Sequence, residues 1–299
     1  MEVERPARRC ERGLIKRLNG KSCCVSGTPC LWKEAVIPNK VHFIFGLRED
    51  FGGKPFSFVH HLAVKSAWDC NQPTQILFHY KHEPQGKWWE KSKPYLTLVP
   101  LEPPTHIFDR PLRHFAHQAD VLRLEILMRE GGIYLDMDVI CLKSFAPLLK
   151  HSFVMGKQET RGLCNAVILA AQNAPFLRAW HEGYRSFRSS GRDNRWDEHS
   201  VLLPNALATE FPSDIHVEGP GSFFWPSYKS PDPLWKECSP ESAFSEQEQL
   251  ADDYQTLGNS FCIHLWETLW WKDHLKALRP KSIRSKADNF SKLCRRFVD

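Results

Sequence analysis

The feature that most constrains this sequence is a Gly-Gly pair between two runs of different hydrophobic period. Apolar residues before the pair recur with helical spacing, at Phe115, Ala119, Leu122 and Ile126. This spacing predicts a helix over residues 112–130, which Gly131 and Gly132 would end in a left-handed conformation. Residues 133–140 then alternate with the period of two that a strand requires. A helix that turns back into a strand is a building unit of α/β folds.

The rest of the chain also alternates between strand and helix patterns. Short apolar runs predict strands over residues 37–46, 75–80, 95–99, 166–170 and 261–265. Helical patterns are found over residues 57–70, 175–188 and 200–210, and a long ordered loop is expected over 219–240. Strands separated by helices form βαβ units. We therefore expect an α/β fold with a mainly parallel central sheet flanked by helices.

Charge divides the chain into a body and two basic ends. The net charge is +5, but residues 1–21 carry +4 and residues 279–299 carry +5, so the middle of the chain is negative. A negative body argues against nucleic acid as a partner. We expect an irregular N-terminal lead-in over residues 1–35, one large domain over 36–275, and a basic helical tail over 276–299.

Apolar runs, cysteines and sequons bear on the compartment. No apolar run approaches the ~18 residues of a transmembrane segment, and the N-terminal residues show no signal-peptide pattern. The ten cysteines form no CxxC pair, and several have the apolar neighbours typical of reduced core residues. As written, the sequence predicts a soluble cytoplasmic protein. The sequon at Asn289 is compatible with a secretory route, so the alternative is the Golgi lumen, with an anchor outside this chain.

Asp136 and Asp138 are the candidate chemical groups of the run at 133–140. Two carboxylates on one face of a strand, beside Tyr134, repel each other unless a cation lies near them. Oxygen ligands of this kind suit Mn²⁺ or Mg²⁺. A divalent cation also stabilises a diphosphate as a leaving group, as transfer from a nucleotide sugar requires. Asp-x-Asp alone also describes a solvated strand end, so the residues around it must distinguish a metal site from such an end.

Asp120 and Arg123 supply those surroundings. They are three residues apart and so share one face of the predicted helix. The helix, the Gly-Gly turn and the strand would bring them near Asp136 and Asp138. An acid and a base beside a metal site can hydrogen-bond sugar hydroxyls and a phosphate. The alternative is a surface ion pair.

Residues 119–123 and 131–138 together resemble the signature of the DXD-containing sugar transferases, the glycosyltransferase family 32 group. This group includes α-1,4-galactosyltransferase-like enzymes, yeast-type initiating mannosyltransferases and bacterial capsular polysaccharide enzymes. His264-Leu265-Trp266 and Trp270 resemble the family's C-terminal His-x-Trp…Trp motif. The resemblance covers about residues 36–275. It implies a GT-A type nucleotide-diphospho-sugar transferase fold with a Rossmann-like sheet.

The resemblance also implies a divalent metal, Mn²⁺ or Mg²⁺, and residues that hold it. Asp138 would bind the metal directly and act in catalysis, while Asp136 would contact the ribose or a metal-bound water. His264 would be a further metal or diphosphate contact, and a buried structural histidine is the alternative. The family often has a second His where this chain has Leu265, and a Ser where it has Leu269.

Further roles follow from the same resemblance. Phe45 occupies the position of an aromatic residue that stacks on the nucleotide base. The residues that would hold the donor sugar and phosphate are Asp120, Arg123 and Tyr134. Asn165 would approach the anomeric carbon as a catalytic residue, and a structural side chain that caps a strand is the alternative. Asp197, Glu198 and His199 form a polar cluster that could meet the acceptor or simply begin a helix.

These expectations describe a hexosyltransferase with a nucleotide-sugar donor. A UDP-sugar is favoured, with a GDP-sugar as the alternative, and the acceptor would be a glycan, a glycolipid or a protein. The family mostly retains anomeric configuration. Retention without a nucleophile implies attack on the face that the diphosphate leaves, with catalysis by positioning and charge stabilisation.

Two rival functions use the same residues. The apolar run into Asp136 and Asp138 also resembles the nucleophile loop of haloacid dehalogenase-like phosphatases, which would need the later pair Asp252-Asp253 as well. The second rival is a non-catalytic nucleotide-sugar-binding relative. The replacement at Leu269 permits it, whereas the intact pair Asp120 and Arg123 argues against it.

Overall fold

A seven-stranded mixed sheet lies at the centre of the computed structural model, which describes residues 37–237, 239 and 242–298. The lead-in expected over 1–35 lies outside the described residues. The strand order is β10-β8-β9-β6-β1-β2-β3. The strands are β1 (Lys40–Ile44), β2 (Gln75–Tyr80), β3 (Thr97–Pro100), β6 (Gly132–Leu135), β8 (Phe153–Gln158), β9 (Gly162–Ala170) and β10 (His216–Glu218). Four of the six strand pairs are parallel and only β9 runs against its neighbours, so the expected sheet is confirmed.

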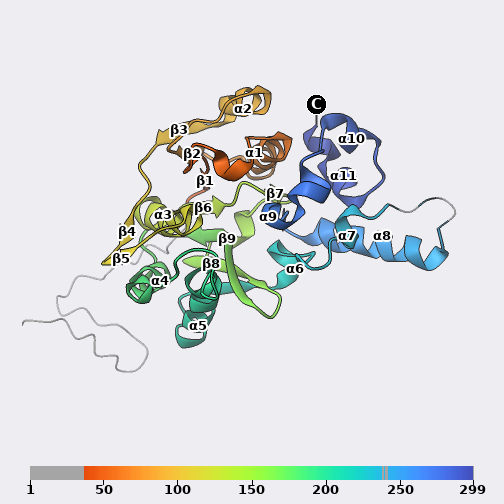
Figure 1. The fold of residues 1–299 in the computed structure, drawn as a ribbon. Coiled ribbons are helices and arrows are strands. Elements are labelled where there is room, and N and C mark those ends of the chain that lie inside the picture. Colours follow the sequence, from red (N-terminus) through yellow and green to blue (C-terminus); the bar gives the residue numbers. More distant parts are fainter. Residues whose placement is uncertain (1–36, 238, 240–241, 299) are drawn as a thin grey trace, which may run out of the picture. The chain divides into compact units, whose positions relative to one another are not determined.

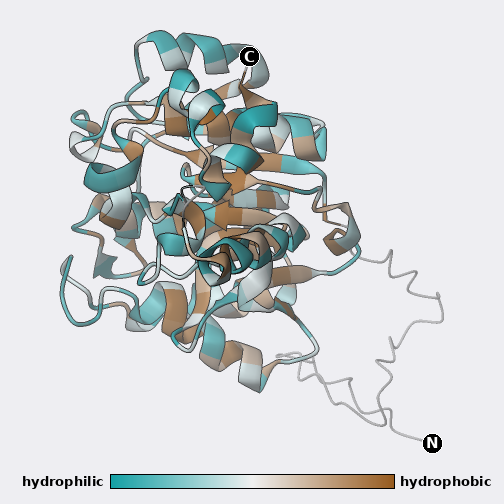
Figure 2. Cartoon of the chain, turned by 90° about the vertical axis from the view of Figure 1, so that its right-hand side faces the viewer, coloured by the Kyte–Doolittle hydropathy of each residue, from teal (hydrophilic) through white to brown (hydrophobic). Residues whose placement is uncertain are grey.

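Helices cover both faces of this sheet (Figure 1). One face carries α1 (Phe58–Asn71) and α2 (Lys87–Ser92), which connect parallel strands. The chain then crosses back through the hairpin of β4 (His106–Ile107) and β5 (Arg110–Pro111). The other face carries α3 (Phe115–Glu130), α4 (Pro175–Gly183) and α5 (Leu203–Glu210). Brown, hydrophobic positions gather in the sheet between these layers, in agreement with the full burial of Phe43, Phe78 and Ile133 (Figure 2).

The single strand predicted over residues 133–140 is wrong. The run divides into β6 in the central sheet and β7 (Val139–Cys141), which pairs antiparallel with β11 (Cys262–His264). Between them the backbone turns, because the Val139 N–H donates to the Asp136 carbonyl at 3.0 Å. Asp136 and Asp138 therefore belong to a tight turn between two sheets instead of one face of a strand.

Other boundaries also differ from the predictions. The helix predicted over 175–188 ends at Gly183, and the one over 200–210 begins with a π-helical turn at Glu198–Leu202. The loop expected over 219–240 contains α6 (Pro220–Phe223) and α7 (Asp232–Trp235). The 16-residue helix α8 (Phe244–Asn259) was not predicted, because its mostly polar sequence buries only Leu250, Asp253 and Leu257.

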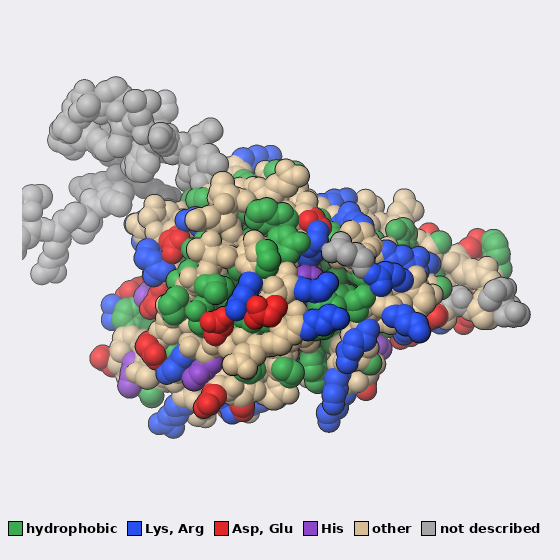
Figure 3. All heavy atoms as spheres, turned by 90° about the horizontal axis from the view of Figure 1, so that it is seen from above, with side chains coloured by type: hydrophobic (Ala, Val, Ile, Leu, Met, Phe, Trp, Pro, Cys, Tyr) green, Lys and Arg blue, Asp and Glu red, His purple; other side chains and the backbone are tan. Residues whose placement is uncertain are grey.

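The C-terminal residues from 276 onward contain α10 (Pro280–Ser285) and α11 (Asn289–Cys294). Ile283, Phe290 and Cys294 are buried in a second hydrophobic cluster that also includes Phe58 and Leu62 of α1. The basic side chains of these helices are exposed, and Lys and Arg gather on the face seen in Figure 3. No helix among the described residues combines the length and apolar character needed to cross a membrane.

Two expectations about individual residues can be compared with this packing. The described cysteines are all free, and Cys141, Cys164, Cys262 and Cys294 are buried, as expected of reduced core residues. Asn289 is also buried, at 1% exposure, and its amide donates to the carbonyls of Pro233 and Leu250. The sequon therefore offers no accessible amide in the folded chain.

Candidate active site

The turn that carries Asp136 and Asp138 is fixed by backbone hydrogen bonds on both sides. The Asp136 N–H donates to the Ala166 carbonyl of β9 at 2.9 Å. The Leu265 N–H, just after β11, donates to the Asp138 carbonyl at 2.9 Å. The turn thus lies between the central sheet and the two-stranded ladder, and both carboxylates are set by rigid neighbours.

Asp138 is held by the C-terminal segment. Its Oδ1 lies 3.3 Å from Nε2 of His264, and its Oδ2 accepts the Glu267 N–H at 2.7 Å. Burial alone would raise the pKa of Asp138, but the charge and hydrogen bond of His264 and the Glu267 N–H outweigh it, so the pKa falls to about 2. Burial would likewise lower the pKa of His264, but Asp138 outweighs that effect and the pKa is raised. In the absence of a metal the two side chains form an ion pair.

Asp136 is held from the other direction. The Tyr134 hydroxyl donates to its Oδ1 at 2.7 Å, and Nη1 of Arg123 lies 3.2 Å from the same oxygen. Burial raises the pKa of Asp136, Arg123 opposes this, and the charge of Asp138 adds to the increase, so the net shift is upward. The raised pKa of Asp136 shows that the positive groups around it do not fully balance its own charge and that of Asp138. A cation between the two carboxylates would supply the missing positive charge.

Asp136, Asp138 and His264 form a candidate metal group. Each offers one ligand atom, and the three atoms lie within 4.8 Å of one another. Ligands of one ion with bonds of about 2.1 Å are at most about 4.2 Å apart, so a small movement closes the group around Mn²⁺ or Mg²⁺. Two carboxylates and one imidazole also suit Mn²⁺ chemically. The residues present therefore fit the expected metal.

Helix α3 supplies the second part of the site. Arg123 is 5% exposed, and its guanidinium contacts Asp120, Asp136 and the Asn165 carbonyl at 3.2, 3.2 and 2.8 Å. The side-chain amide of Asn165 donates to Oδ1 of Asp120 at 2.7 Å. Burial would raise the pKa of Asp120, but Arg123 and other donors outweigh it and the pKa is lowered. Arg123 also lies over the Tyr134 ring, 4.5 Å from its centroid.

Phe45 lies at the end of β1 and reaches this network through His60. Its ring centroid is 4.9 Å from that of His60, whose Nε2 lies 2.9 Å from Oε1 of Glu267. The Glu267 N–H binds Asp138, so the aromatic position and the carboxylate turn share one chain of contacts. Lys54 completes the group, with Nζ 3.2 Å from the other oxygen of Glu267.

Several residues of the site gave no sequence signal that singled them out. His60 and Glu267 are 207 positions apart, and only the fold shows that they meet. Trp266, by contrast, belongs to the His-x-Trp motif noted in the sequence, and the structure shows that its backbone is left-handed at φ 47° and that its ring packs on His264 with centroids 4.1 Å apart. A bulky residue in this conformation is strained, as is common where a side chain must be aimed.

The two departures from the family pattern are in different environments. Leu265 is fully buried in the second hydrophobic cluster, so its side chain serves the core. Leu269 is 55% exposed at the start of the C-terminal segment. The structure therefore places one replacement inside the protein and the other on its surface.

The remaining candidate residues have other partners. Asp197 forms a bidentate pair with Arg161 at 2.7 and 2.8 Å, and Glu198 pairs with Arg188. His199 is buried, with Nε2 3.1 Å from the Ser186 hydroxyl. The phosphatase alternative needs Asp252-Asp253 as a late acidic pair, and the structure places both residues within α8, with no strand directly before them. A helix directs two consecutive side chains to different faces.

Comparisons with known proteins identify the relatives of this chain. The family described as "Glycosyltransferase sugar-binding region containing DXD motif" matches residues 69–155. The chain is 35% identical to glucan organizing enzyme 1 of Cryptococcus neoformans over 279 residues, which cover 89% of this chain and 72% of that protein. It is 42% identical to inositol phosphoceramide mannosyltransferase 3 of Schizosaccharomyces pombe over 60 residues, which cover 20% of this chain and 17% of that one.

Solved structures of glycosyltransferases are similar at low identity. Mouse xyloside xylosyltransferase 1 is 11% identical, with 77% of this chain and 98% of that chain covered and a TM-score of 0.43. The galactosyltransferase LgtC, solved with donor and acceptor sugar analogues, is 14% identical, with 85% and 95% covered and a TM-score of 0.41. The α/β class with a mainly parallel sheet flanked by helices is confirmed by the structure, and the family match confirms that the chain is a glycosyltransferase. This chain belongs to the family of glycosyltransferases that contain a DXD motif in their sugar-binding region.

Proposed function

We propose that this protein is a metal-dependent glycosyltransferase that moves a hexose from a nucleotide sugar to an acceptor with retention of configuration. The observation that carries the proposal is the convergence of Asp136, Asp138 and His264 within 4.8 Å, beside the buried pair Asp120 and Arg123. The first three would hold Mn²⁺ or Mg²⁺. The metal would neutralise the diphosphate as it leaves.

The residues of this chain would divide the remaining tasks. Arg123 is already shared between two carboxylates, so it holds Asp120 and Asp136 in place and presents positive charge to the donor phosphate. Asp120 would accept hydrogen bonds from hydroxyls of the donor sugar. Tyr134 orients Asp136 through its hydroxyl. Phe45 would pack against the nucleotide base, and the adjacent Lys54 would attract the diphosphate.

The arrangement favours a front-face reaction. The carboxylates of Asp120, Asp136 and Asp138 each accept from at least two donors, which weakens them as nucleophiles. Asn165 is neutral, and its amide is directed to Asp120. Catalysis would then consist of positioning the acceptor and stabilising charge on the leaving group. An NMR measurement of the product's anomeric configuration tests this part, and an inverted product contradicts it.

UDP-sugars are the favoured donors and GDP-sugars the alternative, and the acceptor would be a glycan, a glycolipid or a protein. The names of the relatives, a glucan organizing enzyme and an inositol phosphoceramide mannosyltransferase, favour a glycan or a glycolipid. We assign the activity to residues 36–275. The helices from 276 onward, expected as a basic tail, would support the domain from outside the site.

The decisive experiment is a hydrolysis screen with UDP-glucose, UDP-galactose, UDP-N-acetylglucosamine and GDP-mannose, with Mn²⁺ and with a chelator. We expect one donor to be hydrolysed with Mn²⁺, and Asp138→Ala to remove this activity. Asp252→Asn, which changes an exposed carboxylate of α8, is the matched control and should hydrolyse normally. The proposal fails if no donor is bound or hydrolysed in a metal-dependent manner.

A further inference from the structure

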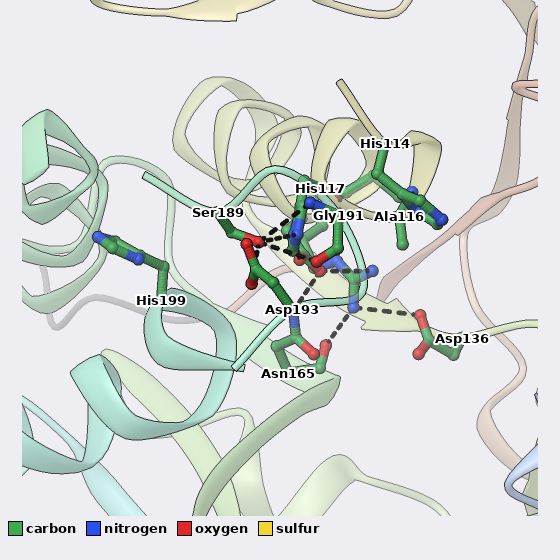
Figure 4. Close-up of polar contacts among 12 residues, drawn as sticks. His114, Ala116, His117, Asp136, Asn165, Ser189, Gly191, Asp193 and His199 are labelled. Atoms are coloured by element: carbon green, nitrogen blue, oxygen red, sulfur yellow. Dashed lines mark hydrogen bonds and ion pairs between the residues drawn. The ribbon is translucent and has the colours of Figure 1, made fainter. Parts of the chain in front are cut away.

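A loop over residues 187–196 packs against the start of helix α3, where Trp196 contacts the N-cap residue His114 with ring centroids 4.9 Å apart and where His117 contacts several residues of the loop. The middle of the loop contacts the imidazole through the Ser189 hydroxyl, which lies 3.0 Å from Nε2. The two ends contact it through rings, since the centroids of Phe187 and Trp196 lie 5.1 and 4.8 Å from that of His117. The His117 imidazole therefore contacts the middle and both ends of the 187–196 loop, and Figure 4 shows it beside Ser189.

The 187–196 loop is braced internally. The Ser189 hydroxyl is within 2.9 Å of both the Gly191 carbonyl and Oδ1 of Asp193. The Asp193 carboxylate also accepts the N–H groups of Ser190 and Arg195, at 2.8 and 2.9 Å. These bonds, the one from Ser190 first, lower the pKa of Asp193, so the carboxylate stays ionised and keeps its donors. These bonds tie residues 189–195 of the loop to one another.

The other nitrogen of His117 reaches the proposed donor site. Nδ1 lies 3.3 Å from Oδ2 of Asp120, whereas Oδ1 of Asp120 is bound by Asn165 and Arg123. Each oxygen of this carboxylate is thus held from a different side. The imidazole is 2% exposed and wedged between Phe187 and Trp196, so it cannot rotate without losing both of its hydrogen bonds.

We propose that His117 is a positioning residue that aims Oδ2 of Asp120 at the donor sugar and links that oxygen to the 187–196 loop. This inference rests on the proposed donor role of Asp120. Because one rigid ring makes both contacts, the position of the loop and the orientation of the carboxylate change together. A disturbance at His117 weakens recognition of the sugar and leaves recognition of the nucleotide intact, since Arg123 lies between Asp120 and Asp136 of the metal group and Phe45 has no ring contact with His117.

Two substitutions separate the contacts of the ring. An Asn amide falls near the position of Nδ1, so His117→Asn keeps the bond to Asp120 and loses the one to Ser189. A Gln amide falls near Nε2, so His117→Gln keeps the bond to Ser189 and loses the one to Asp120. Ser189→Ala is a milder third variant, which frees the loop and leaves the histidine in place.

Calorimetry with Mn²⁺ measures the dissociation constants of UDP and of UDP-glucose or UDP-galactose. The dissociation constant of UDP divided by that of the UDP-sugar gives the affinity that the sugar adds. We repeat the measurement with GDP and GDP-mannose. We expect His117→Gln to reduce this ratio about tenfold, the effect of one lost hydrogen bond to a charged group, with binding of the nucleotide alone unchanged. His117→Asn, which keeps the bond to Asp120 but loses the tie to the loop, should reduce the ratio by a smaller factor while hydrogen exchange in the 187–196 loop increases.

Three other outcomes would test either this inference or the proposed function. If His117→Gln and His117→Asn weaken nucleotide and nucleotide sugar equally, His117 is merely structural and the inference is overturned. Should both variants fail to fold, Ser189→Ala decides: faster exchange in the loop with a lower ratio supports the link, and an unchanged ratio contradicts it. If the unmodified protein binds neither UDP nor GDP with Mn²⁺, the proposed function itself fails, which the variants are not needed to show.

Discussion

Nε2 of His264 lies 3.3 Å from Oδ1 of Asp138, and each residue shifts the pKa of the other in the direction of an ion pair. To bind a metal, an imidazole must be neutral and a carboxylate must be ionised. Asp138 meets this requirement, because its pKa of about 2 keeps it ionised. His264 has a raised pKa in the metal-free protein, so it must release a proton before it can bind a metal.

We therefore predict that Mn²⁺ affinity increases with pH as the His264 proton is lost, and that it levels off above the pKa of His264, which is raised above the ordinary value of ~6.5. Calorimetry in buffers of different ionisation enthalpy should detect close to one proton released per Mn²⁺ bound at and below about pH 6.5. His264→Gln should bind Mn²⁺ more weakly and without this proton release. Equal release from the variant would show that another group is responsible.

The same pair predicts how the metal-free protein responds to pH. The pKa of Asp138 is lowered by folding, so its contribution to stability is present above pH ~4 and is lost as pH falls toward about 2. The pKa of His264 is raised, so its contribution is complete below about pH 6.5 and is lost as pH rises beyond the raised value. Urea unfolding between pH 4 and 9 should show this alkaline loss in the unmodified protein and not in Asp138→Asn.

Arg123 is predicted to be the most costly side chain of the site to remove. Arg123→Met leaves Asp120 and Asp136 buried without their shared cation, which destabilises a protein by about 3–5 kcal/mol. Arg123→Lys keeps the charge but not the planar fork that reaches two carboxylates and a carbonyl, so we expect an intermediate loss. Urea denaturation measures both. Equal stability of Arg123→Met and the unmodified protein would contradict the role assigned to the guanidinium.

Tyr134 allows the hydroxyl and the ring to be tested separately. Tyr134→Phe removes the 2.7 Å hydrogen bond to Asp136 and keeps the ring beneath Arg123. We expect donor hydrolysis to fall about tenfold and the protein to lose about 1.5–3 kcal/mol of stability, since one hydrogen bond to a charged group is lost. Tyr134→Leu also removes the contact with the guanidinium, which adds about 1–2 kcal/mol of destabilisation. Similar thermal stability of the two variants would contradict the second part.

The glycine turn before β6 is predicted to tolerate no side chain. Gly132 has φ of 116°, and a Cβ there would lie 2.6 Å from the Lys40 carbonyl of β1. Gly132→Ala should therefore destabilise the protein by about 2–4 kcal/mol and displace β6 with its carboxylates. Gly258→Ala is the matched control, because this position in α8 has open space around it. The control should be neutral or stabilising by up to about 1 kcal/mol.

The sequence was most informative where the site is local. Asp120, Arg123, Asp136 and Asp138 lie within one helix, one turn and one strand, so their proximity could be predicted from hydrophobic period. Even there the division between β6 and β7 was missed, because a period of two continues through the turn at 136–138. Periodicity reports which side chains are buried, not which sheet a strand joins.

The distant contacts could not be predicted in this way. His264 was suggested only by its resemblance to a family motif, and the roles of the site residues remain predictions. The bond between His117 and Ser189 joins positions 72 apart, and the pair His60 and Glu267 joins positions 207 apart. Such contacts depend on how helices pack on the sheet, which the spacing of residues along one segment does not record.

The pairing of β7 with β11 determines when the Asp-x-Asp turn can meet His264 during synthesis on the ribosome. His264 is paired in register with Val139, the neighbour of Asp138, although the two segments are synthesised more than a hundred residues apart. The Asp-x-Asp turn therefore emerges from the ribosome long before its histidine, and the candidate metal group of a nascent chain stays incomplete until β11 has left the exit tunnel. Contacts between segments so far apart in the sequence are slow to form. A growing chain would thus acquire the proposed affinity for metal only after β11 has been synthesised.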